Sequence, residues 1–178
     1  APSRLISRPG SDVAARTVGV DGVPVAGRAA GAFGPVTQRL QAAYWGLHED
    51  ARYVEHALGN MEGRENIREW IVSTMNMFPG SEMPRFPIEW HVVDEERGRI
   101  VCEVWNDLVD PGDGERHGAS NITILTYAGD GLWSCEEDVY NPATFLRATR
   151  RWAKVAGRHD RLSDEGRSWL AAFGPTGG

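Results

Sequence analysis

Four apolar segments separated by short turns constrain the fold of this chain more than any other feature. They run over Ile88–Val93, Arg99–Val109, His117–Tyr127 and Leu132–Tyr140. The connections between them are rich in Gly and Asp, which form tight turns. Because short connections of this kind join antiparallel neighbours, the sequence predicts a four-stranded meander.

Helical patterns flank the meander on both sides. Before it, a strand is predicted over Asp50–Leu58, then a glycine-bearing turn and a helix opened by Gly63 and ended by Pro79-Gly80. Apolar side chains recur on this helix at the three-and-four spacing of one buried face: Ile67, Trp70, Ile71, Met75 and Phe78. After the meander, Asn141-Pro142 has the form of an N-cap and first-turn proline, which opens a helix through Val155. A last helix is predicted at about 163–173.

This element order predicts an α+β fold in which helices pack on one face of a strongly bent antiparallel sheet. Residues 1–35 are rich in Gly, Ala and Pro and show no sustained period, so we predict an irregular N-terminal arm there. A targeting segment is the alternative, because residues 1–40 are basic. Residues 36–178 are predicted to form a single domain that begins with a short helix at Val36–Leu47.

Composition excludes several classes of partner. The net charge of −6 argues against nucleic-acid binding, which needs a positive surface. The sequence has no apolar run long enough to span a membrane and no secretion signal. Its two cysteines lack metal-ligand spacing, so we expect a cytoplasmic protein with no metal and no other cofactor.

Three motifs carry a family resemblance, two of them before the meander and one on its last strand. His48-Glu-Asp-Ala-Arg-Tyr-Val-Glu-His56 is followed by Gly63-Arg-Glu-Asn-Ile-Arg-Glu-Trp-Ile71, and the last strand reads Trp133-Ser-Cys-Glu-Glu-Asp-Val-Tyr-Asn-Pro142. In this order, over about residues 44–155, they resemble the nuclear transport factor two-like superfamily and its SnoaL-like branch. The resemblance implies a cone-shaped sheet with helices on its concave face and a deep pocket between them. The superfamily includes ketosteroid isomerase, limonene epoxide hydrolase, scytalone dehydratase and polyketide cyclases, and also members without known catalysis.

Three residues are the candidates for catalysis. The resemblance places His56 where the isomerase has its base, and an imidazole suits proton transfer near neutral pH. It makes Asp138 the closing-strand base of epoxide hydrolases and cyclases, and Tyr53 a hydroxyl that positions water. Strand alternation puts Tyr53 and Glu55 on the face opposite His56, and Glu55 is expected to be solvated. The alternatives are a hydrogen-bonded or solvent-facing His56, a core Tyr53 and a capping or salt-bridging Asp138.

Five further residues are predicted to bind substrate: Trp105, Glu103, Asn121, Trp90 and Tyr140. Asn121 lies in a strand expected to be buried, where its amide needs a partner, either a ligand or the backbone. The Arg and Asp that epoxide hydrolases carry two positions apart are not both present in Val101–Asp107, and this disfavours epoxide opening.

The sequence therefore predicts an enzyme that needs no cofactor and acts by acid–base catalysis in an aromatic pocket. Its reaction is of the isomerase, cyclase, dehydratase or epoxide hydrolase type, on an apolar steroid-, terpenoid- or polyketide-like molecule. The alternative is a noncatalytic ligand-binding or dimerisation module of the same fold. A homodimer is expected because Trp133, Cys135 and Val139 alternate outward on the last strand if Asp138 points inward. Nucleic acid and membrane are not expected as partners.

Overall fold

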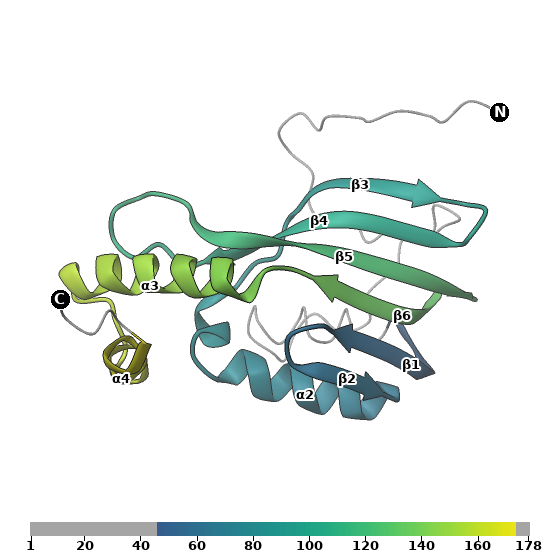
Figure 1. Cartoon of the computed structure of the whole chain (residues 1–178), viewed down its shortest axis with the longest axis horizontal. Coiled ribbons are helices and arrows are strands. Elements are labelled where there is room, and N and C mark those ends of the chain that lie inside the picture. Colours follow the sequence, from purple (N-terminus) through teal and green to yellow (C-terminus); the bar gives the residue numbers. More distant parts are fainter. Residues whose placement is uncertain (1–45, 174–178) are drawn as a thin grey trace, which may run out of the picture.

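A six-stranded sheet organises the computed structural model, which describes residues 46–173 (Figure 1). Its strands are β1 (Leu47–Glu55), β2 (Gly59–Glu62), β3 (Ile88–Asp94), β4 (Arg99–Leu108), β5 (His117–Gly129) and β6 (Leu132–Val139). They lie in the order β2-β1-β6-β5-β4-β3. The predicted meander is present as β3 to β6, all antiparallel, whereas β1 pairs with β6 in parallel. The sheet is thus mixed and open, with β2 and β3 at its edges.

In the described part of the chain, three α-helices cover two regions of this sheet. Helix α2 (Arg64–Asn76) packs against β1, and a 3-10 turn, η1 (Gly80–Glu82), follows it. Helices α3 (Pro142–Arg158) and α4 (Asp164–Phe173) pack on each other near the end of the sheet where β4 ends and β5 begins (Figure 1). The predicted α+β class is confirmed.

Helix α3 begins where the sequence predicts. The Asn141 side chain accepts a hydrogen bond from the Ala143 backbone N–H at 3.0 Å, and Pro142 occupies the first turn. This cap satisfies an N–H that the helix itself leaves unpaired. Helix α2 follows Gly63, whose φ of 83° is in the left-handed region that glycine tolerates best.

Within residues 46–173, most of the buried apolar side chains form two clusters. One joins α2 to the β1 side of the sheet: Leu47, Ala51, Tyr53, Ile67 and Trp133. The other joins α3 to the end of β4 and the segment after α2: Phe78, Met83, Leu108, Trp152, Ala153, Ala156 and Leu162. Trp133 exposes only 7% of its surface, so the prediction that it faces outward is wrong. The β5–β6 register shifts next to its partner Tyr127, and an irregularity of this kind changes the face to which a side chain points.

Element boundaries differ most near the start of the described residues. Strand β1 begins at Leu47 rather than Asp50, and Gly59–Glu62 forms a second strand where the sequence predicts only a turn. The predicted arm at 1–35, and the predicted helix at Val36–Leu47 except for its last two residues, lie outside the described residues. Within residues 46–173, no helix combines the length and the apolar character needed to cross a membrane.

Candidate functional site

A half-buried carboxylate, Asp138 on β6, is held by three side chains from the two neighbouring strands. From β5, Asn121 Nδ2 donates to its Oδ1 at 2.8 Å, and Thr123 Oγ1 donates to the same oxygen at 2.5 Å. From β1, the Tyr53 hydroxyl donates to Oδ2. Both carboxylate oxygens are therefore hydrogen-bonded, and hydrogen bonds to an ionised carboxylate are stronger than neutral ones.

Strand register explains why these residues meet. Thr123 lies opposite Asp138 in the β5–β6 ladder, and Asn121 lies two residues before Thr123 on the same face. In the parallel β1–β6 ladder, Tyr53 lies opposite Glu136 and Glu55 lies opposite Asp138. The central strand β6 thus brings together groups from two flanking strands that are far apart in sequence.

A second asparagine extends this network toward β4. Asn106 Nδ2 donates to Asn121 Oδ1 at 2.7 Å and to the Ala119 carbonyl at 3.2 Å. With its oxygen accepting from Asn106, the Asn121 amide must direct its NH₂ toward Asp138 and Thr123, which it contacts at 2.8 and 2.9 Å. Asn106 therefore orients a group that binds the carboxylate.

Burial raises the pKa values of the ionisable groups around Asp138. Burial, and next the charge of Asp138, raises the pKa of Glu136 from 4.5 to about 8. Burial raises the pKa of Asp138 more than its hydrogen bonds to Thr123, Tyr53 and Asn121 lower it. The pKa of Tyr53 is well above its usual value, first through burial and then through the nearby charges of Glu136 and Asp138. At pH 7, Glu136 and Tyr53 therefore carry protons.

Glu55 belongs to the same cluster of acids. It is only 4% exposed, so the prediction that it is solvated is wrong, and the reason is the β1–β6 pairing that sets it opposite Asp138. Its Oε1 accepts from the Ala57 backbone N–H at 3.1 Å, and the Tyr140 hydroxyl also donates to it. Burial raises the pKa of both Glu55 and Tyr140.

The structure does not bring His56 to Asp138. His56 follows the last residue of β1, and its side chain is 53% exposed. Its Nε2 lies 2.7 Å from Oε1 of Glu137, which is adjacent to Asp138 on β6 and so points to the opposite face. The partner of Asp138 from β1 is Tyr53.

The other predicted residues divide between the two faces of the sheet. Asn121 and Tyr140 lie near Asp138, through the contacts given above. Trp90 and Glu103 face the other side, where Trp90 Nε1 donates to Glu103 Oε2 at 2.6 Å. Trp105 lies two residues beyond Glu103 on the same face. These three residues are therefore separated from Asp138 by the sheet.

Four residues of the site were not predicted to take part: Glu55, Asn106, Thr123 and Glu136. Strand alternation carries the signal for three of them, since each lies two residues from a predicted site residue. No pattern marks Asn106, because its contact depends on the β4–β5 register. Within residues 46–173, no group of His, Cys, Asp and Glu side chains is arranged to hold a metal ion.

Comparison with known proteins adds evidence on the fold. No protein-family model matches the sequence, and no curated protein is significantly similar to it. A solved structure from Catenulispora acidiphila, a hypothetical protein with a ketosteroid isomerase-like fold in complex with trimethylamine, matches with a TM-score of 0.51 and 21% identity. The match covers 64% of this chain and 84% of that one. The chain has the nuclear transport factor two-like fold.

Two further solved structures are similar at a lower level. An LEH-like epoxide hydrolase of M. tuberculosis gives a TM-score of 0.47 at 10% identity, over 64% of this chain and 78% of that one. A steroid delta-isomerase from Pseudomonas aeruginosa gives 0.45 at 17% identity, over 76% and 86%. The match to the Catenulispora acidiphila structure confirms the resemblance inferred from sequence as a likeness of fold.

Proposed function

We propose that this protein is an enzyme that transfers protons on a small, largely apolar molecule, with Asp138 as the base. The observation that carries the proposal is a half-buried carboxylate with a raised pKa, held by three donors beside a second acid. A base with a raised pKa is more effective near neutral pH than an ordinary aspartate. The three donors favour the charged form of Asp138.

Glu136 supplies the matching acid. A pKa of about 8 keeps it protonated at pH 7, two residues from Asp138 on the same face of β6. In several enzymes, two carboxyl groups act as acid and base because their environments keep one protonated and the other ionised. In this proposal Asp138 removes a proton from a carbon next to a carbonyl group. Glu136 donates a hydrogen bond or a proton to the oxygen on which charge develops.

Isomerisation, dehydration and aldol cyclisation need only one base and one acid of this kind. Epoxide opening is a weaker candidate because Asp138 has Asn121 and Thr123 as β5 partners, and the strand Val101–Asp107 lacks the arginine of the epoxide hydrolase pattern. The sequence resemblance directs the choice of substrate to steroid-, terpenoid- and polyketide-like compounds. The aromatic pocket around Asp138 remains a prediction.

The alternative is a noncatalytic ligand-binding or dimerisation module. One observation favours it. The side chains that bind Asp138 come from this chain itself, so their hydrogen bonds also stabilise the pairing of β1 and β5 with β6. A network that only stabilises the sheet needs no substrate.

Turnover by an Asp138→Asn variant separates the two functions. We expect the wild type to turn over at least one compound in a panel of β,γ-unsaturated steroid ketones, β-hydroxy carbonyl compounds, linear polyketide-like ketones and terpene epoxides. Asp138→Asn should reduce the rate by about 100-fold or more, because it removes the base and keeps the shape. Glu137→Gln, one residue away on the opposite face, is the matched control. Turnover that is equal in wild type and Asp138→Asn would refute Asp138 as the base, and ligand binding without turnover would favour the alternative.

A further inference from the structure

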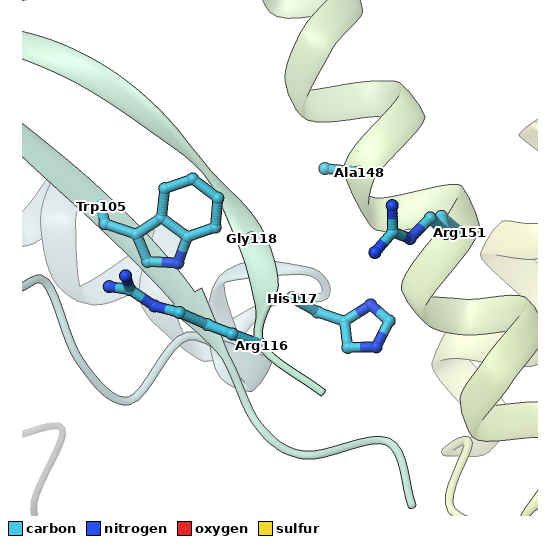
Figure 2. Close-up of a pocket in the computed structure, with 6 residues that line it drawn as sticks. All are labelled: Trp105, Arg116, His117, Gly118, Ala148 and Arg151. Atoms are coloured by element: carbon cyan, nitrogen blue, oxygen red, sulfur yellow. The ribbon is translucent and has the colours of Figure 1, made fainter. Parts of the chain in front are cut away.

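A small cavity lies outside the Asp138 site, between the sheet and α3 (Figure 2). Its volume is about 130 Å³. It is lined by Trp105 of β4, by Arg116, His117 and Gly118 at the start of β5, and by Ala148 and Arg151 of α3. A space of this size accommodates about four water molecules, or one small polyatomic ion. It is too small for a steroid.

The sheet separates Trp105 from the proposed catalytic residues. In the β4–β5 ladder, Val104 lies opposite Asn121, which binds Asp138, and Trp105 lies opposite Ser120. Adjacent residues of a strand point to opposite faces, so the Trp105 ring and the Asp138 carboxylate lie on different sides of the sheet. Neither Asp138 nor any of its three partners lines the cavity, so the cavity is a separate candidate site.

Trp105 contributes a hydrogen-bond donor that is buried and unpaired. Its indole Nε1 has no hydrogen-bond partner in the described residues 46–173. An indole N–H only donates, and a buried donor without an acceptor costs about 1–3 kcal/mol. Gly118 adjoins this nitrogen: a Cβ added there would lie 2.8 Å from Nε1 and 2.1 Å from the Asn106 carbonyl oxygen. Gly118, which also lines the cavity, therefore places no side chain against this nitrogen.

Arg151 contributes a cation on the helix side. Figure 2 shows its guanidinium directed from α3 toward β5, with Trp105 and His117 across from it. In the described part of the chain it forms no hydrogen bond or ion pair. An arginine that is exposed only to water needs no explanation, but this one lines the same cavity as a buried donor that lacks an acceptor.

The remaining polar groups of the cavity have partners. The Arg116 guanidinium lies 4.7 Å from the Trp105 ring centroid and pairs with Glu89 at 2.6 Å, so its charge is used there. His117 Nε2 lies 3.1 Å from both oxygens of Asp113, which makes this nitrogen a donor. Among the described residues, the cavity groups without a partner are thus the Arg151 guanidinium and the Trp105 indole N–H, and both are donors.

We propose that this cavity binds a small oxyanion, a carboxylate or a phosphate, between the Arg151 guanidinium and the Trp105 indole N–H. A guanidinium presents paired N–H groups that match the oxygens of such an anion, and hydrogen bonds to a charged group are about twice as strong as neutral ones. The bound anion connects α3 to β4. It therefore stabilises the packing of α3 on the sheet, because a ligand that binds only the folded state stabilises that state.

Nuclear magnetic resonance of the indole N–H tests this proposal. The full chain is titrated with sodium acetate or sodium phosphate, while sodium chloride keeps the ionic strength constant. Loss of a signal in Trp105→Phe identifies the Trp105 indole proton. In the wild type this signal should shift and saturate with acetate, with phosphate or with both. The two titrations distinguish the two oxyanions.

Two arginine variants on the same helix give the decisive comparison. Arg151→Gln should weaken the affinity about tenfold or more, since it removes a charge-assisted contact. Arg147→Gln makes the same charge change one turn away, where the arginine donates to Thr144 at 3.0 Å, and should leave the affinity unchanged. A signal that does not saturate indicates a water-filled cavity and overturns the proposal, as does equal weakening by both variants. The readout does not involve turnover, so its outcome is independent of the role of Asp138.

Discussion

Replacing Glu136 with glutamine should stabilise the protein at alkaline pH and have little effect at acidic pH. The folded state keeps a proton on Glu136 that the unfolded chain releases above pH 4.5. The stability of the wild type therefore falls as pH rises from 4.5 to about 8, because the folded state binds more protons than the unfolded state in this window. Glutamine does not titrate, so the stability of the variant does not fall for this reason.

The size of the effect follows from the pKa shift. A change from 4.5 to about 8 corresponds to about 5 kcal/mol, at 1.36 kcal/mol per pKa unit. Relaxation around the half-buried side chain recovers part of this cost, so we expect a gain of roughly 2–4 kcal/mol at pH 8. Near pH 4.5 the carboxylic acid and the amide are both neutral, and the difference should be close to zero.

Urea denaturation at a series of pH values measures this difference. Glu137→Gln is the control, because Glu137 is the next residue, points to the other face and pairs with the exposed His56. Its effect should stay below about 1 kcal/mol at every pH. A gain for Glu136→Gln that is independent of pH, or a loss of stability at pH 8, would show that Glu136 is not protonated in the folded state.

Three further predictions concern other parts of the molecule. Tyr53→Phe should raise the pKa of Asp138 further and reduce stability by about 1.5–3 kcal/mol, because a donor to a carboxylate is lost; carboxyl NMR and urea denaturation measure the two effects. The homodimer stays a prediction, and exposed Trp90 and Val92 on edge strand β3 make it testable: Val92→Arg should reduce the mass measured by light scattering to that of one chain, and an unchanged mass would exclude this strand from the interface. Burial raises the pKa of the Cys102 thiol to about 11, so it should resist alkylation at pH 8 until the protein unfolds, as mass spectrometry of cleaved peptides can show.

Local patterns in the sequence predicted most of the fold. The meander, α2 and α3 follow from turn residues, apolar periodicity and the Asn141-Pro142 cap, which are properties of neighbouring residues. The parallel pairing of β1 with β6 was missed because it joins segments far apart in the chain, and no local pattern encodes it. The inward turn of Trp133 was missed for a related reason, since an irregular register is not visible in strand alternation.

The sequence also predicted part of the candidate site. Asp138 and Tyr53 were both identified, and the structure joins them directly. His56 was paired with Asp138 because the two match family positions, but the end of β1 turns it toward Glu137 on the other face. The sequence predicts a solvated Glu55, whereas strand pairing buries it. Side-chain type alone did not determine which of these ionisable groups is buried.

The parallel contact between β1 and β6 also links assembly of the sheet to proton uptake. Tyr53 and Asp138 are 85 residues apart, so β1 reaches β6 only by closing a long loop, a slow kind of step in folding. The same step brings Glu55 next to Asp138 and Tyr53 next to Glu136. Carboxyl groups with raised pKa values take up protons as this contact forms. We therefore expect β1 and β2 to detach from the sheet more often as pH rises, with faster amide hydrogen exchange there than in the β4–β5 ladder after correction for the intrinsic effect of pH.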